Sequence, residues 1–192
     1  KNVCNIAAEY AIPVHTDAVA AYGHIPVNVK ELGVDYLSVS AHKIGGAKGT
    51  GFLYAKAANI NPYIYGGGQE KGKRSGTENV VGIMGLAKAA EIAQEKLDSR
   101  IEEENITKNY ITDRILREIK GSSLNGDYKK RISGNMNFAF TGINGGELVI
   151  MLDKNGICVS AGSGALAMFS LASQNLELVQ HVMVIRVDHL TY

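Results

Sequence analysis

The sequence predicts an α/β fold, and three features of its pattern indicate this class. Short runs of strand-forming residues alternate with loops over residues 12–54, as in a sheet built from separated strands. A long helical segment follows the glycine-rich stretch 66–76. The last third combines strands with a helix. We expect two domains, residues 1–90 and 91–192, the second a smaller α+β unit.

Three strands are expected in the first part, with a short helix or turn in "VKELGVD" (29–35). They are "IPVH" (12–15), "DYLSVS" (35–40) and "GFLYA" (51–55). Ser75 and Glu78 stand three residues apart just before an apolar run, which is the pattern of a helix capping box. Two apolar stripes at helical spacing follow, the first at Ala90, Ala93, Leu97 and Ile101 and the second at Ile111, Ile115 and Ile119.

The last third predicts strands around a single helix. "NMNFAF" (135–140) alternates, so Met136, Phe138 and Phe140 share one face of a strand. "GGELVIMLDKNG" (145–156) reads as a helix that ends at the turn pair Asn155-Gly156. A short strand "ICVS" (157–160), a loop and a late strand "VMVIRV" (182–187) complete the pattern.

Composition excludes several classes of function. The 192 residues carry a net charge of +1, so no strong field favours nucleic acid or an anionic membrane. No apolar run is long enough to predict a membrane span. Cys4 and Cys158 lack metal-ligand spacing and indicate a reducing, cytoplasmic compartment. No signal peptide or initiator methionine is visible, and the start resembles the middle of a domain.

The glycine-rich loops do not match the common nucleotide-binding motifs. "IGGAKGTG" lacks the Walker pattern, and "GGGQEKG" has Lys71 where a dinucleotide loop needs its third glycine. The five histidines show no zinc-ligand spacing. ATP, NAD and a metal are therefore not predicted.

Lys43 follows the strand "YLSVS" and precedes glycines, a context that suits an amine nucleophile. A partly desolvated lysine can form a Schiff base with an aldehyde such as pyridoxal phosphate. Asp17 could hold the pyridine nitrogen of that cofactor, and Ser40 and His42 could meet its phosphate. A lysine at a strand end is also commonly a surface residue with its charge in water, so spacing alone leaves both interpretations open.

Four segments together resemble the cysteine desulfurases, pyridoxal-phosphate enzymes of the class V aminotransferase group. They are the run from His15 to Tyr54, "GGGQEKGKRSGTENV", "SGNMNFAF" and "GICVSAGSGA". The resemblance implies fold type I, with the C-terminal part of a mainly parallel large-domain sheet and an incomplete small domain. It also implies a homodimer, a small amino-acid substrate such as cysteine, and a role in iron–sulfur cluster assembly.

The resemblance assigns roles to individual residues. Lys43 matches the Schiff-base lysine, and Asp17 matches the aspartate on the pyridinium nitrogen. Ser40 and His42 match phosphate-binding residues, and Thr77 matches the threonine that reaches the phosphate of the neighbouring subunit. Arg186 matches the arginine that holds the substrate carboxylate, although a surface strand residue is an equal interpretation.

The chain departs from the family at several positions. Ala20 replaces a glutamine near the cofactor's phenolic oxygen, Ala47 a proline and Gly45 an aromatic residue of the lysine loop. Ala165 stands where the family carries its catalytic cysteine. Because sulfur transfer requires a thiolate, Ala165 argues against desulfurase activity of this chain. Cys158, seven residues upstream, is expected to be a buried structural thiol.

Three functions remain open from the sequence. The chain is a desulfurase relative that keeps part of the cofactor site, a non-catalytic relative or interaction protein, or another class V lyase or aminotransferase. Lys43 and Asp17 favour the first and third. Ala165, Ala20 and the absence of the family's N-terminal half from this sequence favour the second.

Overall fold

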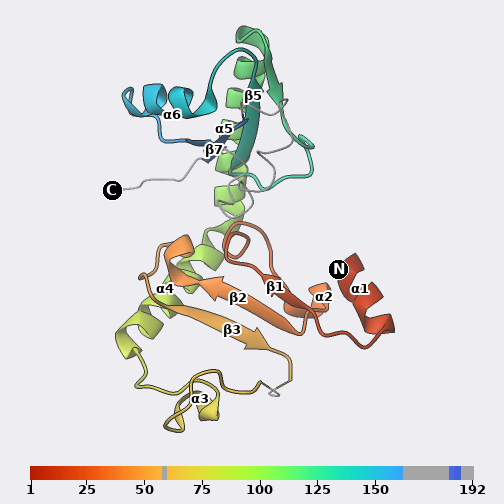
Figure 1. The fold of residues 1–192 in the computed structure, drawn as a ribbon, viewed down its shortest axis with the longest axis vertical. Helices are drawn as coiled ribbons and strands as arrows, with labels where there is room; N and C mark the ends of the chain where they lie inside the picture. The colour runs from red at the N-terminus through yellow and green to blue at the C-terminus, as the bar shows by residue number, and fades with distance from the viewer. Residues whose placement is uncertain (58–59, 162–181, 187–192) are drawn as a thin grey trace. The chain divides into compact units, whose positions relative to one another are not determined.

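The computed structural model describes the backbone of residues 1–57, 60–161 and 182–186, and the side chains of the first two ranges (Figure 1). The chain divides into two compact units, Lys1–Asp98 and Ser99–Tyr192. This division lies a few residues beyond the boundary predicted near residue 90. The assignment of the units to a cofactor-binding domain and a small C-terminal domain stays a prediction.

The first unit contains a three-stranded sheet in the order β1–β2–β3. β1 and β2 are parallel, and β3 is antiparallel to β2. The sheet and the helices around it confirm the predicted α/β class. In chain order the elements are α1 (Asn2–Glu9), β1 (His15–Asp17), α2 (Val29–Leu32), β2 (Tyr36–Ser40), the 3-10 helix η1 (Ala41–Ile44), β3 (Gly51–Ala55), α3 (Gln69–Gly72) and α4 (Val80–Glu95).

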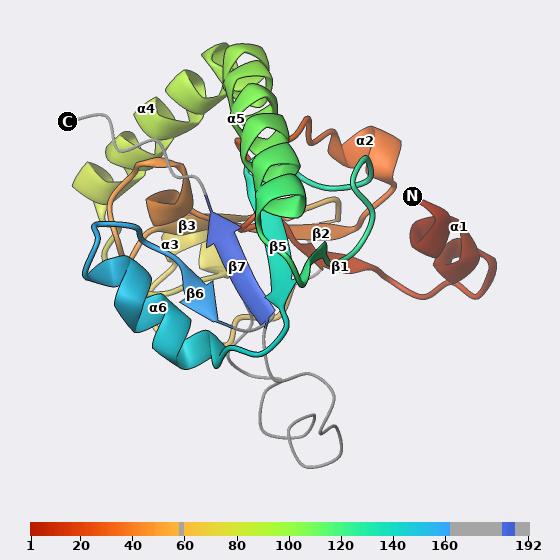
Figure 2. The same ribbon diagram turned by 90° about the horizontal axis from the view of Figure 1, so that it is seen from above.

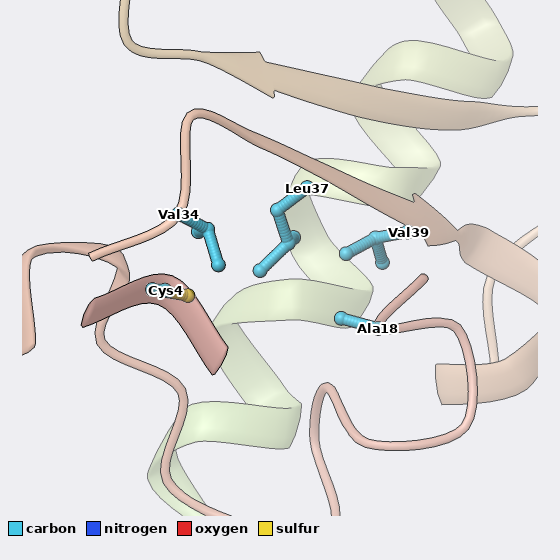
Figure 3. Close-up of a cluster of buried hydrophobic side chains, with 5 residues drawn as sticks. All are labelled: Cys4, Ala18, Val34, Leu37 and Val39. Carbon is cyan, nitrogen blue, oxygen red and sulfur yellow. The ribbon is translucent and has the colours of Figure 1, made fainter. Parts of the chain in front are cut away.

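A hydrophobic cluster lies on one face of this sheet, as Figure 3 shows. β2 alternates between buried and partly exposed side chains, so Leu37 and Val39 point into the cluster. Cys4 of α1 and Val34, just before β2, pack beside them. Ala18 is 4% exposed and immediately follows β1, so the hydrophobic core fixes the backbone at the end of that strand.

The first strand begins later than the sequence pattern predicts. Pro13 has no amide donor for a strand ladder, and Ile12 is 58% exposed. The amide of Val14 donates to the Asp35 carboxylate at 2.9 Å instead of to a strand. Regular pairing therefore starts at His15.

The predicted capping box at Ser75 and Glu78 is wrong. The helix begins at Val80, and the side chain of Asn79 caps it by accepting a hydrogen bond from Gly82 N at 3.1 Å. Ser75 is 6% exposed and its hydroxyl donates to the carbonyl of Gly67 at 2.8 Å. Because the Ser75 hydroxyl donates to the glycine-rich loop, it does not cap the helix.

The first apolar stripe predicted a continuous helix, but the helix is interrupted at Lys96. α4 ends at Glu95 and α5 (Leu97–Glu118) begins directly afterwards. Lys96 has φ −95° and ψ 7°, outside the helical range. Two residues of the predicted stripe are buried, Ala93 at 1% and Leu97 at 5% exposure.

The second unit contains an antiparallel sheet in the order β4–β5–β7–β6. Met136 and Phe138 of β5 are both 0% exposed, which confirms the predicted alternation, and β4 is a strand that the sequence did not reveal. α6 lies against β6 and β7 (Figure 2). Besides α5, the elements are β4 (Ser122–Leu124), β5 (Asn135–Phe140), α6 (Gly145–Asp153), β6 (Ser160–Ala161) and β7 (Val182–Arg186).

The most deeply buried side of α5 is polar. Glu104, Lys108 and Thr112 follow one another at helical spacing and are 2–6% exposed. Ser133 donates a hydrogen bond to Glu104, and Lys108 Nζ donates to Asn105 Oδ1 at 2.7 Å. Burial lowers the pKa of Lys108, because it penalises the charged ammonium.

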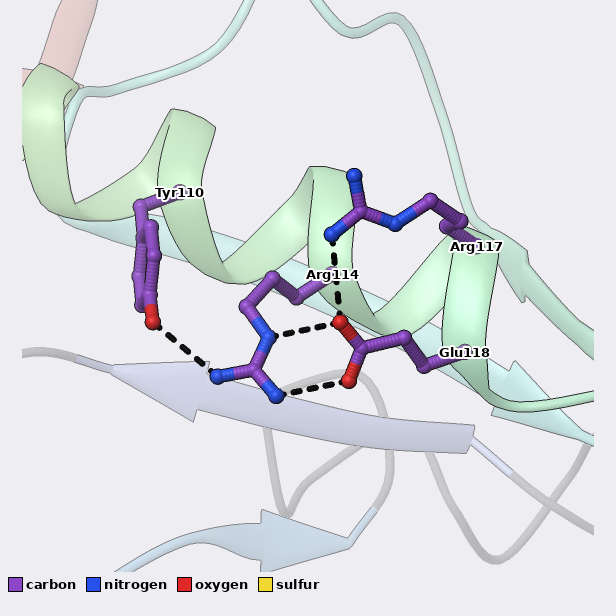
Figure 4. A network of polar contacts seen from close by, with 4 residues as sticks. All are labelled: Tyr110, Arg114, Arg117 and Glu118. Atoms are coloured by element: carbon purple, nitrogen blue, oxygen red, sulfur yellow. Dashed lines mark hydrogen bonds and ion pairs between the residues drawn. The ribbon is translucent and has the colours of Figure 1, made fainter.

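An exposed side of α5 carries a small network of charges, drawn in Figure 4. Arg114 donates two hydrogen bonds to the Glu118 carboxylate, at 2.8 and 2.6 Å, and Arg117 adds a third at 3.1 Å. Arg114 also donates to the hydroxyl of Tyr110 at 3.0 Å. The hydrogen bonds from Arg114 and then Arg117 lower the pKa of Glu118 to about 2.

In the part of the chain that the structure describes, no helix is both long and apolar enough to cross a membrane. The same residues contain no group of three or more His, Cys, Asp or Glu side chains that could hold a metal ion.

Candidate cofactor site

The candidate site lies at one edge of the first sheet. β1 and β2 are parallel, with Asp17 opposite Ser38 in register. The carboxyl ends of parallel strands meet at the same edge of a sheet, where ligands of α/β proteins usually bind. Asp17 is the last residue of β1 and Ser40 is the last residue of β2. The strand pairing therefore brings Asp17 to the edge from which η1, with His42 and Lys43, continues.

Asp17 is exposed and keeps one carboxylate oxygen available. Its Oδ1 accepts a hydrogen bond from Val19 N at 2.8 Å, which fixes the rotation of the side chain. Within the described residues Oδ2 has no hydrogen-bond partner. An oriented carboxylate of this kind can accept a charge-assisted hydrogen bond from a protonated ring nitrogen.

Ser40 and His42 form a polar pair at the end of β2. A hydrogen bond joins Ser40 Oγ and His42 Nδ1 at 2.8 Å, with the direction set by the tautomer of the ring. Ser40 is still in an extended conformation, and the chain turns into the 3-10 helix directly after it. The hydroxyl and the imidazole are both groups that can bind a phosphate oxygen.

Lys43 is half-buried within a turn that is anchored on both sides. Ala41 and Ile44 are 0% and 7% exposed, and they pack against a cluster on α4 formed by Leu86, Ala89 and Ala93. The lysine between them thus has a fixed backbone while its side chain reaches partly into solvent. This arrangement explains why a lysine follows a buried strand here.

Glycines make the turn after Lys43 possible. Gly45 ends η1 at φ 85°, a left-handed conformation that glycine adopts without strain. A Cβ on Gly46 would lie 2.9 Å from the Cβ of Ala41, which is too close for a side chain. The backbone of Gly46 also donates to Ala41 O at 2.9 Å. The two glycines therefore allow the backbone to make the tight turn after Lys43.

Thr77 is not joined by hydrogen bonds to the described residues at the sheet edge. It is exposed, in the loop that precedes α4. The described residues show no hydrogen bond from Thr77 to Asp17, Ser40, His42 or Lys43. Its predicted role toward a neighbouring subunit stays a prediction.

The remaining predicted positions fall mainly in the second unit. Ala165 lies outside the described residues. Arg186 is the last residue of β7, opposite Asn135 of β5 in register, and its side chain also lies outside them. Cys158 is exposed, so the prediction of a buried thiol is wrong. It precedes the two-residue strand β6.

Sequence reasoning missed a contact beside Asp17. A hydrogen bond joins His15 Nε2 and Ser38 Oγ at 2.7 Å. Both residues were part of predicted strands, and the alternation of side chains could have placed them on the face of Asp17. Their pairing could not be read from the sequence, because it depends on which strands are neighbours and in which register.

Comparison with known proteins identifies the family. The Aminotransferase class-V family matches residues 1–187. The chain belongs to this family. Its members depend on pyridoxal phosphate, and the solved relatives have the fold of pyridoxal-phosphate enzymes of type I. The predicted fold class and cofactor type are thereby confirmed at the level of the family.

Individual relatives are cysteine desulfurases by name. The chain is 47% identical over 164 residues to the cysteine desulfurase IscS of Dictyoglomus turgidum, covering 85% of this chain and 42% of that protein. It is 44% identical over 167 residues to that of Methanosarcina thermophila, covering 85% and 40%. The chain thus spans less than half the length of these curated relatives.

Solved structures show the same likeness. The NifS-like protein of Rickettsia africae superposes with a TM-score of 0.84 at 28% identity, covering all of this chain and 52% of that one. A second NifS-like protein gives a TM-score of 0.85 at 32% identity, covering 97% and 50%.

The residues at the sheet edge fit part of a pyridoxal-phosphate site. Asp17 offers a carboxylate with an open oxygen, which suits a pyridine nitrogen that must stay protonated. The hydroxyl of Ser40 and the ring of His42 suit a phosphate. Lys43 supplies an amine on an anchored turn. The donor set therefore agrees with the cofactor of the family.

Proposed function

We propose that this chain forms part of a pyridoxal-phosphate-dependent protein of the cysteine desulfurase type. One observation supports this proposal most strongly: one edge of a parallel strand pair carries Asp17, Ser40, His42 and Lys43. When bound, pyridoxal phosphate supplies an electron sink for bonds at the α-carbon of an amino acid.

In this proposal each residue has a defined task. Lys43 would hold the cofactor through its amine, and the same amine would move a proton at the substrate's α-carbon. Asp17 Oδ2 would accept a hydrogen bond from the ring nitrogen and would keep that nitrogen protonated. Ser40 and His42 bind the phosphate, and Arg186 binds the substrate carboxylate.

The decisive test of the proposal traps the cofactor on Lys43. The chain is incubated with pyridoxal phosphate, reduced with borohydride and digested for mass spectrometry. A pyridoxyl group is expected on Lys43 and absent from Lys43→Arg, which keeps the charge but lacks the nucleophilic amine. Lys48→Arg is the matched control, an exposed lysine five residues later in the same loop. An unlabelled Lys43 peptide in the parent would contradict the proposal.

We further propose that the complete protein is a homodimer in which Thr77 serves the partner's cofactor phosphate. Exposed apolar residues on the first turns of α4 support an assembly: Val80 is 60%, Val81 84% and Met84 67% exposed. An apolar surface of this kind is typical of a contact region. Val81→Glu should convert a dimer to a monomer in light scattering, whereas Gln94→Glu, at an exposed position near the other end of α4, should leave it intact.

A second candidate function is favoured by Ala165. With alanine at the position of the family's nucleophile, the chain would keep the cofactor but transfer no sulfur, as a non-catalytic relative or another class V lyase or aminotransferase. No sulfide should form from cysteine, even when the preceding half of a working relative is joined to the chain. Ala165→Cys in that fusion should restore sulfide release. Sulfide from the parent that survives Cys158→Ala would disprove the assignment of Ala165.

A further inference from the structure

The end of β1 makes several contacts with one residue of β2, namely Ser38. Ser38 lies opposite Asp17 in the parallel register. Its hydroxyl is joined to His15 Nε2 at 2.7 Å, and its carbonyl accepts a hydrogen bond from Ala18 N at 2.9 Å. The residues on both sides of Asp17 are therefore held by the same serine.

His15 and Asp17 share one face of β1, because side chains two residues apart in a strand point the same way. Both are exposed, whereas Ala18 is buried in the core. The core thus fixes the chain at Ala18, directly after Asp17. On the N-terminal side, the side-chain bond to Ser38 provides a second point of attachment.

The side chain of Asp17 depends on this backbone. Oδ1 accepts from Val19 N at 2.8 Å, so the direction of Oδ2 follows the conformation of the chain from Asp17 to Val19. Rotation of the strand end would turn the carboxylate with it. A ligand nitrogen that needs Oδ2 in one place would then lose part of its hydrogen bond, since that interaction weakens steeply with angle.

We propose that His15 is a positioning residue for Asp17: by binding Ser38 it holds the end of β1 so that Oδ2 points to the pyridine nitrogen of the cofactor. This inference rests on the proposed function for its ligand, but the placement of Asp17 can be tested without the cofactor. His15 contacts no reacting atom in this scheme. Its effect passes through Ser38 and the strand.

The first experiment measures amide hydrogen exchange in the chain without cofactor. In His15→Phe, the amides of Ala18 and Val19 should exchange about 2- to 5-fold faster, as expected for the loss of one exposed hydrogen bond. His15→Gln, which can still bond to Ser38, should restore slow exchange. Tyr36→Phe is the matched control, because Tyr36 lies opposite His15 in register but takes no part in the bond.

A double-mutant comparison assigns the effect to the pair. Ser38→Ala should accelerate the same two amides, and adding His15→Phe to it should have no further effect. Unchanged exchange at Ala18 and Val19 in His15→Phe would refute the proposal. An equal acceleration at Phe138 in the second unit would also refute it, because the effect would then be a general loss of stability.

The second experiment titrates each variant with pyridoxal phosphate and follows the cofactor absorbance. His15→Phe should weaken binding about 2- to 5-fold, and His15→Gln should bind like the parent. If the parent does not bind the cofactor, the proposed function fails, while the exchange data still decide whether His15 positions Asp17. If the parent binds and His15→Phe binds equally well despite faster exchange, His15 has no role toward the cofactor.

Discussion

Two of the segments that carry predicted cofactor residues, the turn of Lys43 and the loop of Thr77, differ in how they are held. Lys43 lies between two buried residues, Ala41 and Ile44, that pack on α4. Thr77 lies in an exposed glycine-flanked loop, which is held near it by the buried Ser75 and by the hydrogen bond from Gly76 N to Gln69 Oε1 at 3.1 Å. The chain's own core therefore determines the position of Lys43. The loop of Thr77 is instead held by contacts with other residues of the glycine-rich segment, and Thr77 itself is exposed.

The largest effect is expected where the lysine turn meets the helix. Ile44→Ala removes a buried side chain from the cluster with Leu86 and Ala93 and should lower the free energy of unfolding by about 2–5 kcal/mol. Urea unfolding followed by circular dichroism measures it. A loss below about 0.5 kcal/mol would show that α4 does not anchor the turn.

Gly46→Ala should produce the next largest effect. The added methyl group would meet Ala41 Cβ at 2.9 Å and Ala41 O at 3.1 Å, and such overpacking costs about 1–3 kcal/mol. Gly85→Ala is the control, since a Cβ added at Gly85 would meet no atom within 4 Å. In the interior of α4 it should stabilise by about 0.5–1 kcal/mol. If both variants behave alike in thermal unfolding, the close packing behind Lys43 is not real.

Removal of the cap of α4 should have an intermediate effect. Asn79→Ala abolishes the hydrogen bond to Gly82 N and should cost about 1 kcal/mol. Glu78→Ala, one residue earlier, should change the unfolding midpoint very little, because Glu78 does not cap the helix. A larger loss of stability in urea for Glu78→Ala than for Asn79→Ala would support the capping box predicted from the sequence instead.

A smaller effect on stability is expected at Glu118, an exposed residue that binds two arginines. Its pKa is lowered to about 2 by hydrogen bonds from Arg114 and Arg117. A carboxyl with a lowered folded-state pKa adds stability above its unfolded pKa, and this stability is lost as the pH falls from about 4.5 toward 2. Glu118→Gln should flatten the acid dependence of unfolding in that window. NMR titration of the parent should find Glu118 still ionised at pH 3.5; a midpoint near 4.5 would contradict the network.

The smallest effect on stability is expected at Thr77. Thr77→Ala should change the free energy of unfolding by less than about 0.5 kcal/mol, because the side chain is exposed. Cofactor affinity of the assembled protein should nevertheless fall. A large loss of stability in the isolated chain would show that Thr77 is held by its own unit, as Lys43 is.

What the sequence could predict was mainly local. The alternation in β5 and the turn glycine after α6 depend on neighbouring residues, and both were predicted correctly. The positions of Asp17 and Lys43 near the ends of strands also followed from the sequence, whereas the parallel pairing that brings the two strand ends to one edge did not. The cap at Asn79 and the burial of Ser75 were missed, because the Ser75 hydroxyl donates to Gly67 O within the same glycine-rich stretch, and sequence spacing does not reveal that contact. The exposure of Cys158 likewise depends on a strand that proved to be only two residues long.

The parallel pairing of β1 and β2 also has a consequence for folding order. The bond between His15 and Ser38 spans 23 residues of sequence, and the turn that bears Lys43 packs on α4, which lies further along the chain. Contacts of this separation form only after the intervening segment has closed. During synthesis, η1 therefore lacks its packing partners on α4, such as Leu86 and Ala89, until that helix has left the ribosome. The amine of Lys43 thus reaches its final position only after α4, which ends at Glu95, has been made.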